Sequence, residues 1–387
     1  MRAALRLLVL LPLFAIVRPV AGQVQAGKYT APPSAMSQGA AWQGVIEHFE
    51  APVRWRGKFG RYRSPLLFAD GSRAKTADDW QRRRAEILAD WQRLLGEWPP
   101  LITTPDVHID QPQRQAGYTK YRIRFDWIPG QETTGYLLVP DGEGPHPAVV
   151  SVYYEPETAV GLGKPDRDFA RQLAIRGFVA LSIGTTQATK AKTYSLYYPS
   201  VENAQVQPLS MLGYAAANAW QVLAAREDVD SSRIGIVGHS FGGKWAMFAS
   251  CLFDGFACAV WSDPGIVFDQ RQSVNYWEPW YLGYHAPPWR KRGLVTEESP
   301  ARGLYPKLLS AGRDLHELHA LMAPRPFLVS GGSEDPPHRW EALNHSIEVN
   351  RLLGYHHRVG MTNRPEHSPT PESNGVIYRF FESVLNP

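Results

Sequence analysis

The sequence of 387 residues lacks the patterns that are typical of disulfide-rich, metal-binding and nucleic-acid-binding proteins. It has only two cysteines, Cys251 and Cys258, and both lie in apolar segments, which favours buried free thiols over a disulfide. It contains no H-E-x-x-H, no C-x-x-C and no carboxylate triplet, so we expect no metal and no other cofactor. The formal net charge is only +4, without a basic tail or helix, which argues against a nucleic-acid partner.

Long hydrophobic runs are also absent, apart from a short one near the N-terminus. Residues 1–22 begin with Arg2 and Arg6, continue into the apolar run Leu7–Val17 and end in small residues. This order is typical of a secretory signal peptide. The run is shorter than the ~20 apolar residues that a membrane span needs. We therefore predict an exported protein, periplasmic or extracellular, with no stable membrane anchor.

The composition that is present supports a large core, because 44% of the residues are hydrophobic. Residues 23–117 predict an N-terminal arm and a helical extension. The arm, 23–70, has no clear period. The helix follows Thr76 as N-cap, with Asp78 and Asp79 in its first turn and apolar residues at helical spacing behind them. We expect this extension to serve packing.

Residues 118–387 predict a second unit, in which strands and helices alternate. A hairpin pattern comes first, and repeated strand–helix pairs follow. Such an order favours an α/β fold with a mostly parallel central sheet and helices on both faces. Residues 263–323 interrupt the pattern as an insertion, which we expect to cover the carboxyl edge of the sheet as a lid.

The stretch Gly238-His239-Ser240-Phe241-Gly242 has the pattern of a nucleophile elbow. A buried strand precedes it and a helix follows it, which is the context that raises a serine hydroxyl above a sheet. The backbone N–H of Phe241 would then face a developing oxyanion at the positive end of the helix. A phosphate-binding loop, the alternative, would prefer G-x-G-x-x-G after the first strand. We predict that Ser240 is a nucleophile.

A serine nucleophile needs a base and an acid that orients the base. Glu334 and Asp335 follow the apolar strand 327–330, and His367 lies in the loop before the last helix. Their chain order, serine then acid then histidine, is that of α/β-hydrolases. Asp335 stands at a Gly-x-x-Asp position, so we predict the triad Ser240, Asp335 and His367, with Glu334 as the alternative acid.

Two further groups of residues are candidates for the site. Tyr154 begins the loop after the strand 148–154 and could supply the second oxyanion donor, although a tyrosine packed beside the sheet is an equal alternative. The insertion concentrates Trp277, Trp280 and Trp289 beside basic residues. Aromatic faces stack on sugar rings, so we predict that these tryptophans bind substrate; packing against the arm is the alternative.

Three stretches resemble the glucuronoyl esterases, within a wider likeness to secreted carbohydrate esterases and to prolyl-oligopeptidase-like and dienelactone-hydrolase-like proteins. They are the helix 78–99, the elbow GHSFGGK at 238–244 and the segment 314–332. The resemblance implies an α/β-hydrolase fold and a substrate-binding role for Lys244, which stands in the matching place of the elbow.

The sequence departs from those esterases at two points. They carry an arginine directly after the nucleophile, where it helps to hold the oxyanion, and this chain has Phe241. Their acid often follows an earlier strand, and this would point to Asp263 or Asp269 instead of Asp335. Acetyl xylan esterases of the deacetylase type have a Gly-Gly-Ser-Gln-Gly-Gly elbow, which is not matched.

We predict a secreted serine esterase that hydrolyses an acetyl or uronoyl ester on a carbohydrate, either a small molecule or a polysaccharide. A peptidase of the prolyl oligopeptidase kind is the alternative, although no β-propeller precedes the hydrolase unit to restrict access. A glycan-binding protein without activity is a third hypothesis, and the complete serine, acid and histidine set argues against it.

Overall fold

The antiparallel hairpin predicted near residue 118 forms one side of a sheet of ten strands. The structure, a computed structural model, describes residues 39–191, 195–269 and 295–386. The predicted signal peptide and the tryptophans 277, 280 and 289 lie outside these ranges. The strands are β1 Val107–Ile109, β2 Gln113–Gln115, β3 Tyr118–Ile128, β4 Gln131–Pro140, β5 His146–Tyr153, β6 Val179–Gly184, β7 Val229–His239, β8 Cys258–Ser262, β9 Phe327–Gly331 and β10 Val359–Asn363.

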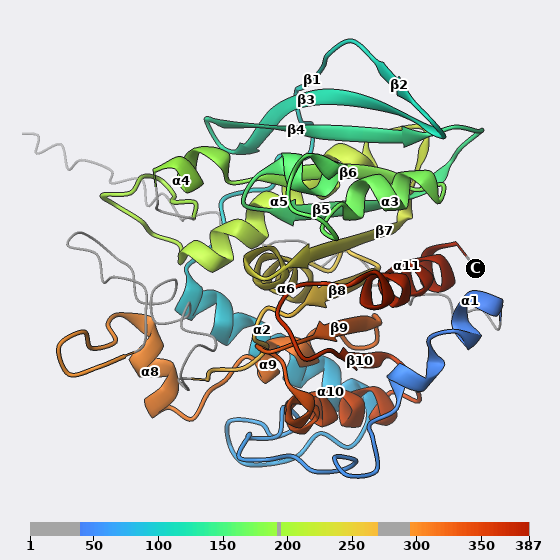
Figure 1. The fold of residues 1–387 in the computed structure, drawn as a ribbon. Helices are drawn as coiled ribbons and strands as arrows, with labels where there is room; N and C mark the ends of the chain where they lie inside the picture. The colour runs from blue at the N-terminus through green and yellow to red at the C-terminus, as the bar shows by residue number, and fades with distance from the viewer. Residues whose placement is uncertain (1–38, 192–194, 270–294, 387) are drawn as a thin grey trace, which may run out of the picture.

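The strand order confirms the predicted, mostly parallel sheet. It runs β1-β3-β4-β6-β5-β7-β8-β9-β10, with β2 beside β3 (Figure 1). The pairs from β6 to β10 are parallel, whereas β3, β4 and β6 pair antiparallel. The strands β6, β8 and β9 are buried along their whole length, and β5 is buried at all but its two end residues, as expected for strands with helices on both faces. Two short edge strands, β1 and β2, lie in the segment that we had assigned to the N-terminal extension.

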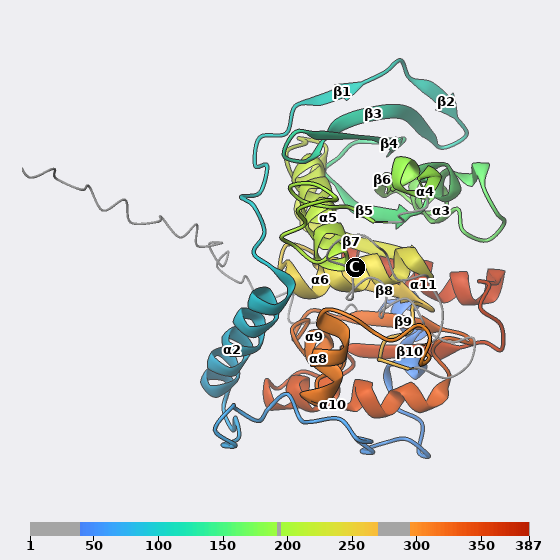
Figure 2. The ribbon, with the colours of Figure 1, turned by 90° about the vertical axis from the view of Figure 1, so that its left-hand side faces the viewer.

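Helices cover both faces of this sheet (Figures 1 and 2). One face carries α5, α6, α9 and α10, and the other carries α3 and α11, with the short α1 beside α11. The bounds of these and the remaining helices are α1 Ala40–Gln43, η1 Ile46–Phe49, α2 Ala77–Leu95, η2 Thr158–Leu162, α3 Phe169–Ile175, α4 Thr186–Lys190, α5 Pro208–Ala224, α6 Phe241–Leu252, α8 Leu304–Ser310, α9 His316–Ala320, η3 Pro337–Arg339, α10 Trp340–Leu352 and α11 Pro371–Leu385. Among the described residues, no helix is long and apolar enough to cross a membrane.

The predicted helix after Thr76 is present as α2 and begins with a capping box. The Thr76 hydroxyl accepts from the N–H of Asp79, and the Asp79 carboxylate accepts from the N–H of Thr76. Its apolar stripe is buried against the α/β unit, where the Trp91 indole donates to the Glu317 carboxylate at 3.0 Å. The predicted packing role of this helix is therefore confirmed.

The arm that precedes α2 is held to the sheet unit by aromatic rings and by buried histidines. Phe49 stacks on Phe380 at 5.6 Å. The His316 ring nitrogen Nε2 donates to the Arg63 carbonyl at 2.7 Å, and His345 contacts the Phe59 carbonyl in the same way at 3.1 Å. Cys251 in α6 and Cys258 in β8 are free and buried, as predicted.

Acid should weaken this attachment of the arm through His316. Burial lowers the pKa of His316 to about 3, so between pH 6.5 and 3 only the unfolded chain takes up this proton. Stability that depends on neutral His316 is therefore lost as the pH falls below 6.5. From pH 7.5 to 5.0 the loss amounts to about 2 kcal/mol of unfolding free energy. Urea unfolding should show a correspondingly smaller acid effect in His316→Gln.

The matched control for this measurement is His108→Gln in the exposed edge strand β1, where the side chain is about half exposed. This variant should lose as much stability as the unaltered chain over the same pH interval. An acid effect of equal size in His316→Gln and the unaltered chain would contradict the assignment of the proton to His316.

Candidate active site

Ser240 stands at a strained turn between β7 and α6. Its backbone has φ 57° and ψ −118°, a region that residues with a side chain rarely adopt. Two glycines make the turn possible. A Cβ on Gly238 would lie 2.1 Å from the Gly242 carbonyl oxygen, and one on Gly242 would lie 2.1 Å from the Val152 carbonyl oxygen. The predicted strand–turn–helix geometry is therefore present, with Ser240 at its tip.

Ser240 and His367 are brought together, although they are 127 residues apart in the chain. His367 Nε2 lies 2.8 Å from Ser240 Oγ, and His367 Nδ1 lies 2.7 Å from Asp263 Oδ2. The carboxylate can only accept, so Nδ1 carries the proton, and Nε2 accepts from the serine hydroxyl. Asp263 is fully buried, while the His367 side chain is 37% exposed.

The predicted pairing of Asp335 with His367 is wrong, because Asp263 makes this contact. Asp263 comes directly after β8, and its positive φ of 49° turns the side chain toward His367. Asp335 is buried beneath the same turn, and its two oxygens accept from the N–H groups of Gly265 and Ile266 at 2.8 and 2.7 Å. Both ring nitrogens of His367 are occupied by Ser240 and Asp263.

The other acids that we considered lie elsewhere. Asp269 is paired with Arg339 at 2.7 Å. Glu334 contributes its backbone, with its N–H 3.3 Å from Asp263 Oδ2 and its carbonyl accepting from Arg339. The position after an earlier strand, which the resemblance to the glucuronoyl esterases suggested, is therefore the one that contacts the histidine, through Asp263.

This chain is similar to known proteins in sequence and in structure. The model of the prolyl oligopeptidase family matches residues 216–339, which include Ser240 and Asp263. A 4-O-methyl-glucuronoyl methylesterase of Podospora anserina is 23% identical over 194 residues, which are 49% of this chain and 37% of that protein. The chain thus spans little more than a third of the length of this curated relative.

Solved structures are similar over most of the chain. A glucuronoyl esterase from Solibacter usitatus has a TM-score of 0.66 at 17% identity, and the match covers 83% of this chain and 97% of that one. A promiscuous esterase of carbohydrate esterase family 15, from a marine bacterial metagenome, has a TM-score of 0.62 at 16% identity, with 88% and 99% covered. This chain has the α/β-hydrolase fold.

Arg364 supports the loop of His367, and sequence reasoning had missed it. Its buried guanidinium donates to the carbonyls of His367 at 2.7 Å and Ser368 at 2.8 Å, and also to Ser330 and Gly331 at the end of β9. Arg364 thereby ties the histidine loop to the sheet. The only signal in the sequence was the position of this arginine, three residues before a candidate histidine. Its partners are backbone carbonyls, which no sequence pattern reveals.

His239 is a second residue that the sequence did not single out. It is buried, its ring lies 4.7 Å from that of His367, and its Nδ1 is 3.1 Å from the Ser262 carbonyl oxygen. Burial lowers the pKa of His239 well below its usual value, so the ring is neutral. A neutral ring behind His367 adds no fixed positive charge to the candidate site.

The two residues predicted to supply oxyanion donors, Tyr154 and Phe241, lie against each other beside the elbow. The ring of Tyr154 stacks on the ring of Phe241, with centroids 4.5 Å apart and planes 12° apart. This stack holds the loop after β5 against the first residue of α6, and the Phe241 ring itself is buried. The roles of Tyr154 and Phe241 as donors stay predictions.

Lys244 is placed inside the protein, away from solvent. It is 2% exposed, and its ammonium donates to the Gly265 carbonyl, in the turn that follows Asp263. This hydrogen bond from Lys244 therefore stabilises the turn after Asp263. Its predicted role in substrate binding, like that of Trp277, Trp280 and Trp289, stays a prediction.

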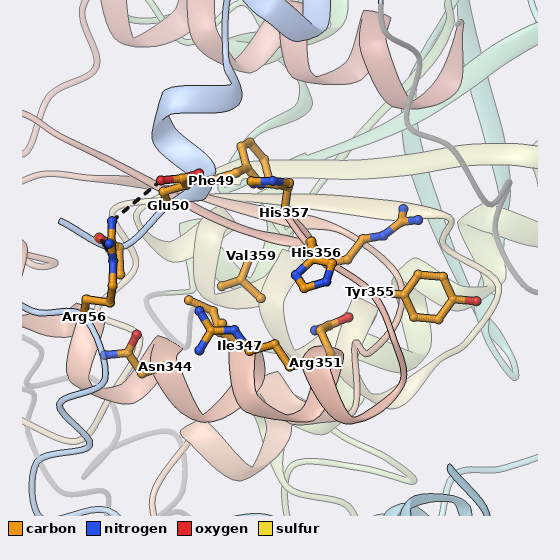
Figure 3. Close-up of a pocket in the computed structure, with 13 residues that line it drawn as sticks. Phe49, Glu50, Arg56, Asn344, Ile347, Arg351, Tyr355, His356, His357 and Val359 are labelled. Carbon is orange, nitrogen blue, oxygen red and sulfur yellow. Dashed lines mark hydrogen bonds and ion pairs between the residues drawn. The ribbon is translucent and has the colours of Figure 1, made fainter. Parts of the chain in front are cut away.

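Two cavities lie apart from Ser240, Asp263 and His367. A cavity of about 300 Å³ lies between η1, the end of α10 and the start of β10, with Arg56, Arg351 and His356 around it (Figure 3). A larger cavity of about 740 Å³ is lined by Tyr62, Phe268 and Arg339, among others, and follows β8 and β9 at the same sheet edge as the triad. Among the described residues, no three His, Cys, Asp or Glu side chains are grouped as a metal site would require.

Gly238→Ala should destabilise the protein and disrupt the elbow. The added methyl group would meet the backbone of Gly242, which cannot move aside as a flexible side chain can. We expect a loss of at least about 1–3 kcal/mol of unfolding free energy, measured by urea unfolding. The matched control is Gly375→Ala in α11, where the nearest atoms belong to the Arg379 side chain at 3.5 Å or more and helix propensity favours alanine by up to ~1 kcal/mol. Equal effects of the two substitutions would contradict this account of the turn.

Proposed function

We propose that this protein is a serine esterase that hydrolyses an ester bond on a carbohydrate. The observation that carries the proposal is the continuous chain of hydrogen bonds from Ser240 through His367 to Asp263, at 2.8 and 2.7 Å. A serine hydroxyl on a strained elbow, in contact with an imidazole that a buried carboxylate orients, is the arrangement that activates an oxygen nucleophile.

The reaction proceeds in two halves. Ser240 Oγ attacks the ester carbonyl while His367 Nε2 takes its proton, and the collapse of the tetrahedral intermediate releases the alcohol, which receives that proton from His367. Water then attacks the acyl-enzyme, again with His367 as base, and frees the acid and Ser240. Asp263 holds the imidazole in the correct tautomer and stabilises the imidazolium that forms in each half.

The negative charge on the carbonyl oxygen is stabilised by backbone donors. The N–H of Phe241 stands at the start of α6, a helix of 12 residues, where the positive end of the helix dipole favours an anion. The loop after β5, where Tyr154 stacks on Phe241, supplies the second donor. Because Phe241 occupies the position of an arginine in the glucuronoyl esterases, this oxyanion hole works without a side-chain cation there.

We propose a uronoyl ester as the preferred substrate, with an acetyl ester as the alternative. Two of the relatives described above carry the name of glucuronoyl esterases, and this supports an acyl group that belongs to a sugar acid. Cleavage of such an ester transfers the uronoyl group to Ser240 Oγ and releases the alcohol, and water then frees the uronate. Export of the protein, proposed from the pattern of residues 1–22, would place it where plant or algal glycans occur.

The similarity to the prolyl oligopeptidase family supports a second candidate, a serine peptidase. The chemistry at Ser240 would be the same, with an amine as leaving group. Prolyl p-nitroanilides separate the two candidates, since an esterase of this kind should leave them intact while it hydrolyses simple esters.

Ser240→Ala should remove the esterase activity. Loss of the nucleophile lowers kcat by roughly 10⁴-fold or more, with little change in KM. The test uses methyl glucuronate, benzyl glucuronate and acetylated xylo-oligosaccharides, together with fluorophosphonate labelling read by mass spectrometry. Ser310→Ala, an exposed serine at the end of α8, is the control and should keep full activity and labelling. If the folded, unaltered protein takes no label and hydrolyses none of these esters, the proposed function is wrong.

A further inference from the structure

We propose that Asp335 is a positioning residue, which holds Asp263 against His367 from the neighbouring loop. This inference rests on the proposed function, since it concerns the group that orients the base of the triad. It gives a role to the carboxylate that the sequence had suggested as the acid itself. Asp263 and Asp335 form what we call the carboxylate clamp, in which each side chain binds the backbone of the loop that carries the other.

The first half of the carboxylate clamp starts from Asp263, after β8. Its Oδ1 accepts from the N–H of Gly332 at 2.6 Å and of Asp335 at 2.9 Å, both in the loop after β9. Its Oδ2 accepts from His367, with the Glu334 N–H at 3.3 Å. A carboxylate with so many donors is held in one orientation, because rotation would break several charge-assisted hydrogen bonds at once.

The second half starts from Asp335, after β9. Its two oxygens accept from the N–H groups of Gly265 and Ile266, in the turn that follows Asp263. This turn is strained at Asp263, whose φ of 49° lies in the left-handed region that residues with a side chain rarely adopt. A backbone of this kind persists only where its surroundings hold it. Asp335 holds the turn through its hydrogen bonds to Gly265 and Ile266. Both Asp263 and Asp335 have no exposed surface, so water does not compete for these bonds.

The charges around the clamp come from four elements. Asp263 lies on the loop after β8, Arg339 on η3 is 3.6 Å from Asp335, Lys244 reaches the turn from α6, and Arg364 at the end of β10 faces both carboxylates. Burial, and next the negative charge of Asp263, raise the pKa of Asp335 to about 6. Asp335 therefore carries a negative charge in the clamp above pH 6 and loses it below that pH.

The geometry favours positioning over a direct role for Asp335. Its oxygens are used by two backbone N–H groups, and the ring nitrogens of His367 are used by Ser240 and Asp263. Any effect of Asp335 on the reaction must then pass through Asp263. When one residue acts only through another, the effects of their two substitutions on kcat are strongly non-additive. A double-mutant cycle measures this non-additivity.

The experiment combines Asp263→Asn and Asp335→Asn. Asparagine keeps the volume of Asp335 but turns an N–H₂ toward one of the two backbone donors. We expect Asp335→Asn alone to lower kcat about 10–100-fold with KM almost unchanged, as for residues that orient a reacting ligand. Asp263→Asn alone should cost roughly 10³–10⁴-fold. Added to Asp263→Asn, the second substitution should cost less than about 3-fold.

Asp314→Asn is the matched control for a general loss of stability. Asp314 is also a buried carboxylate with a pKa of about 6, and it accepts from the N–H groups of Phe268 and Leu315 at 2.8 and 2.6 Å. It holds the same segment of chain farther from Asp263. Its substitution should keep kcat within about 3-fold, even where it lowers the thermal unfolding midpoint as much as Asp335→Asn does.

The dependence of kcat on pH distinguishes a positioning role of Asp335 from a general folding defect. Below pH 6 the protonated Asp335 resembles the asparagine, so the ratio of kcat between the unaltered enzyme and Asp335→Asn should shrink from pH 8 to pH 5. A constant ratio, or additive costs in the cycle, would overturn the inference. So would a loss in Asp335→Asn that exceeds the loss in Asp263→Asn, because Asp335 would then be the acid.

Proton NMR separates this inference from the proposed function. The His367 Nδ1–H bonded to Asp263 should give a low-field resonance that Asp263→Asn removes, in protein labelled with ¹⁵N-histidine. We expect Asp335→Asn to shift or broaden it and Asp314→Asn to leave it in place. If the protein hydrolyses no ester but the resonance behaves in this way, the proposed function fails and the clamp stands. An unchanged resonance in Asp335→Asn overturns the clamp whatever the activity.

Discussion

Two buried carboxylates at one edge of the sheet constrain the whole site. A charged group without solvent must be surrounded by donors, and here each carboxylate finds them in the loop of the other. The loops after β8 and β9 are therefore locked together. Since Asp263 also contacts His367, and Arg364 ties the loop of His367 to the end of β9, three loops become one rigid support for Ser240.

The parallel sheet makes this support possible. β7, β8, β9 and β10 are neighbours, and their carboxyl ends meet at one edge. Ser240, Asp263 and His367 each follow one of these strands, so segments more than 100 residues apart in the chain come within hydrogen-bond distance. The helices on both faces bury the strands, and the outer antiparallel strands extend the sheet on the far side from Ser240, Asp263 and His367. This is how a common fold carries a specific site.

Local patterns in the sequence were sufficient for most of the fold. The capping box at Thr76, the hairpin from Tyr118 and the strand–turn–helix around Ser240 depend on residues within a few positions of one another. For the same reason, Ser240 and the loop of His367 could be identified before the structure. Arg364 could not, because its partners are carbonyl groups of loops whose arrangement no local pattern describes.

The acid that contacts His367 could not be predicted from the sequence and required the tertiary structure. The sequence by itself determined that an aspartate follows each of two neighbouring strands and that a serine and a histidine stand in the right order. Which aspartate contacts His367 depended on the backbone turns after β8 and β9. Asp263, at a positive φ, faces the imidazole, and Asp335 is satisfied by two backbone N–H groups beneath it. Only the tertiary structure decided this, because the hydrogen-bond partners that separate the two carboxylates come from about 70 residues away in the chain.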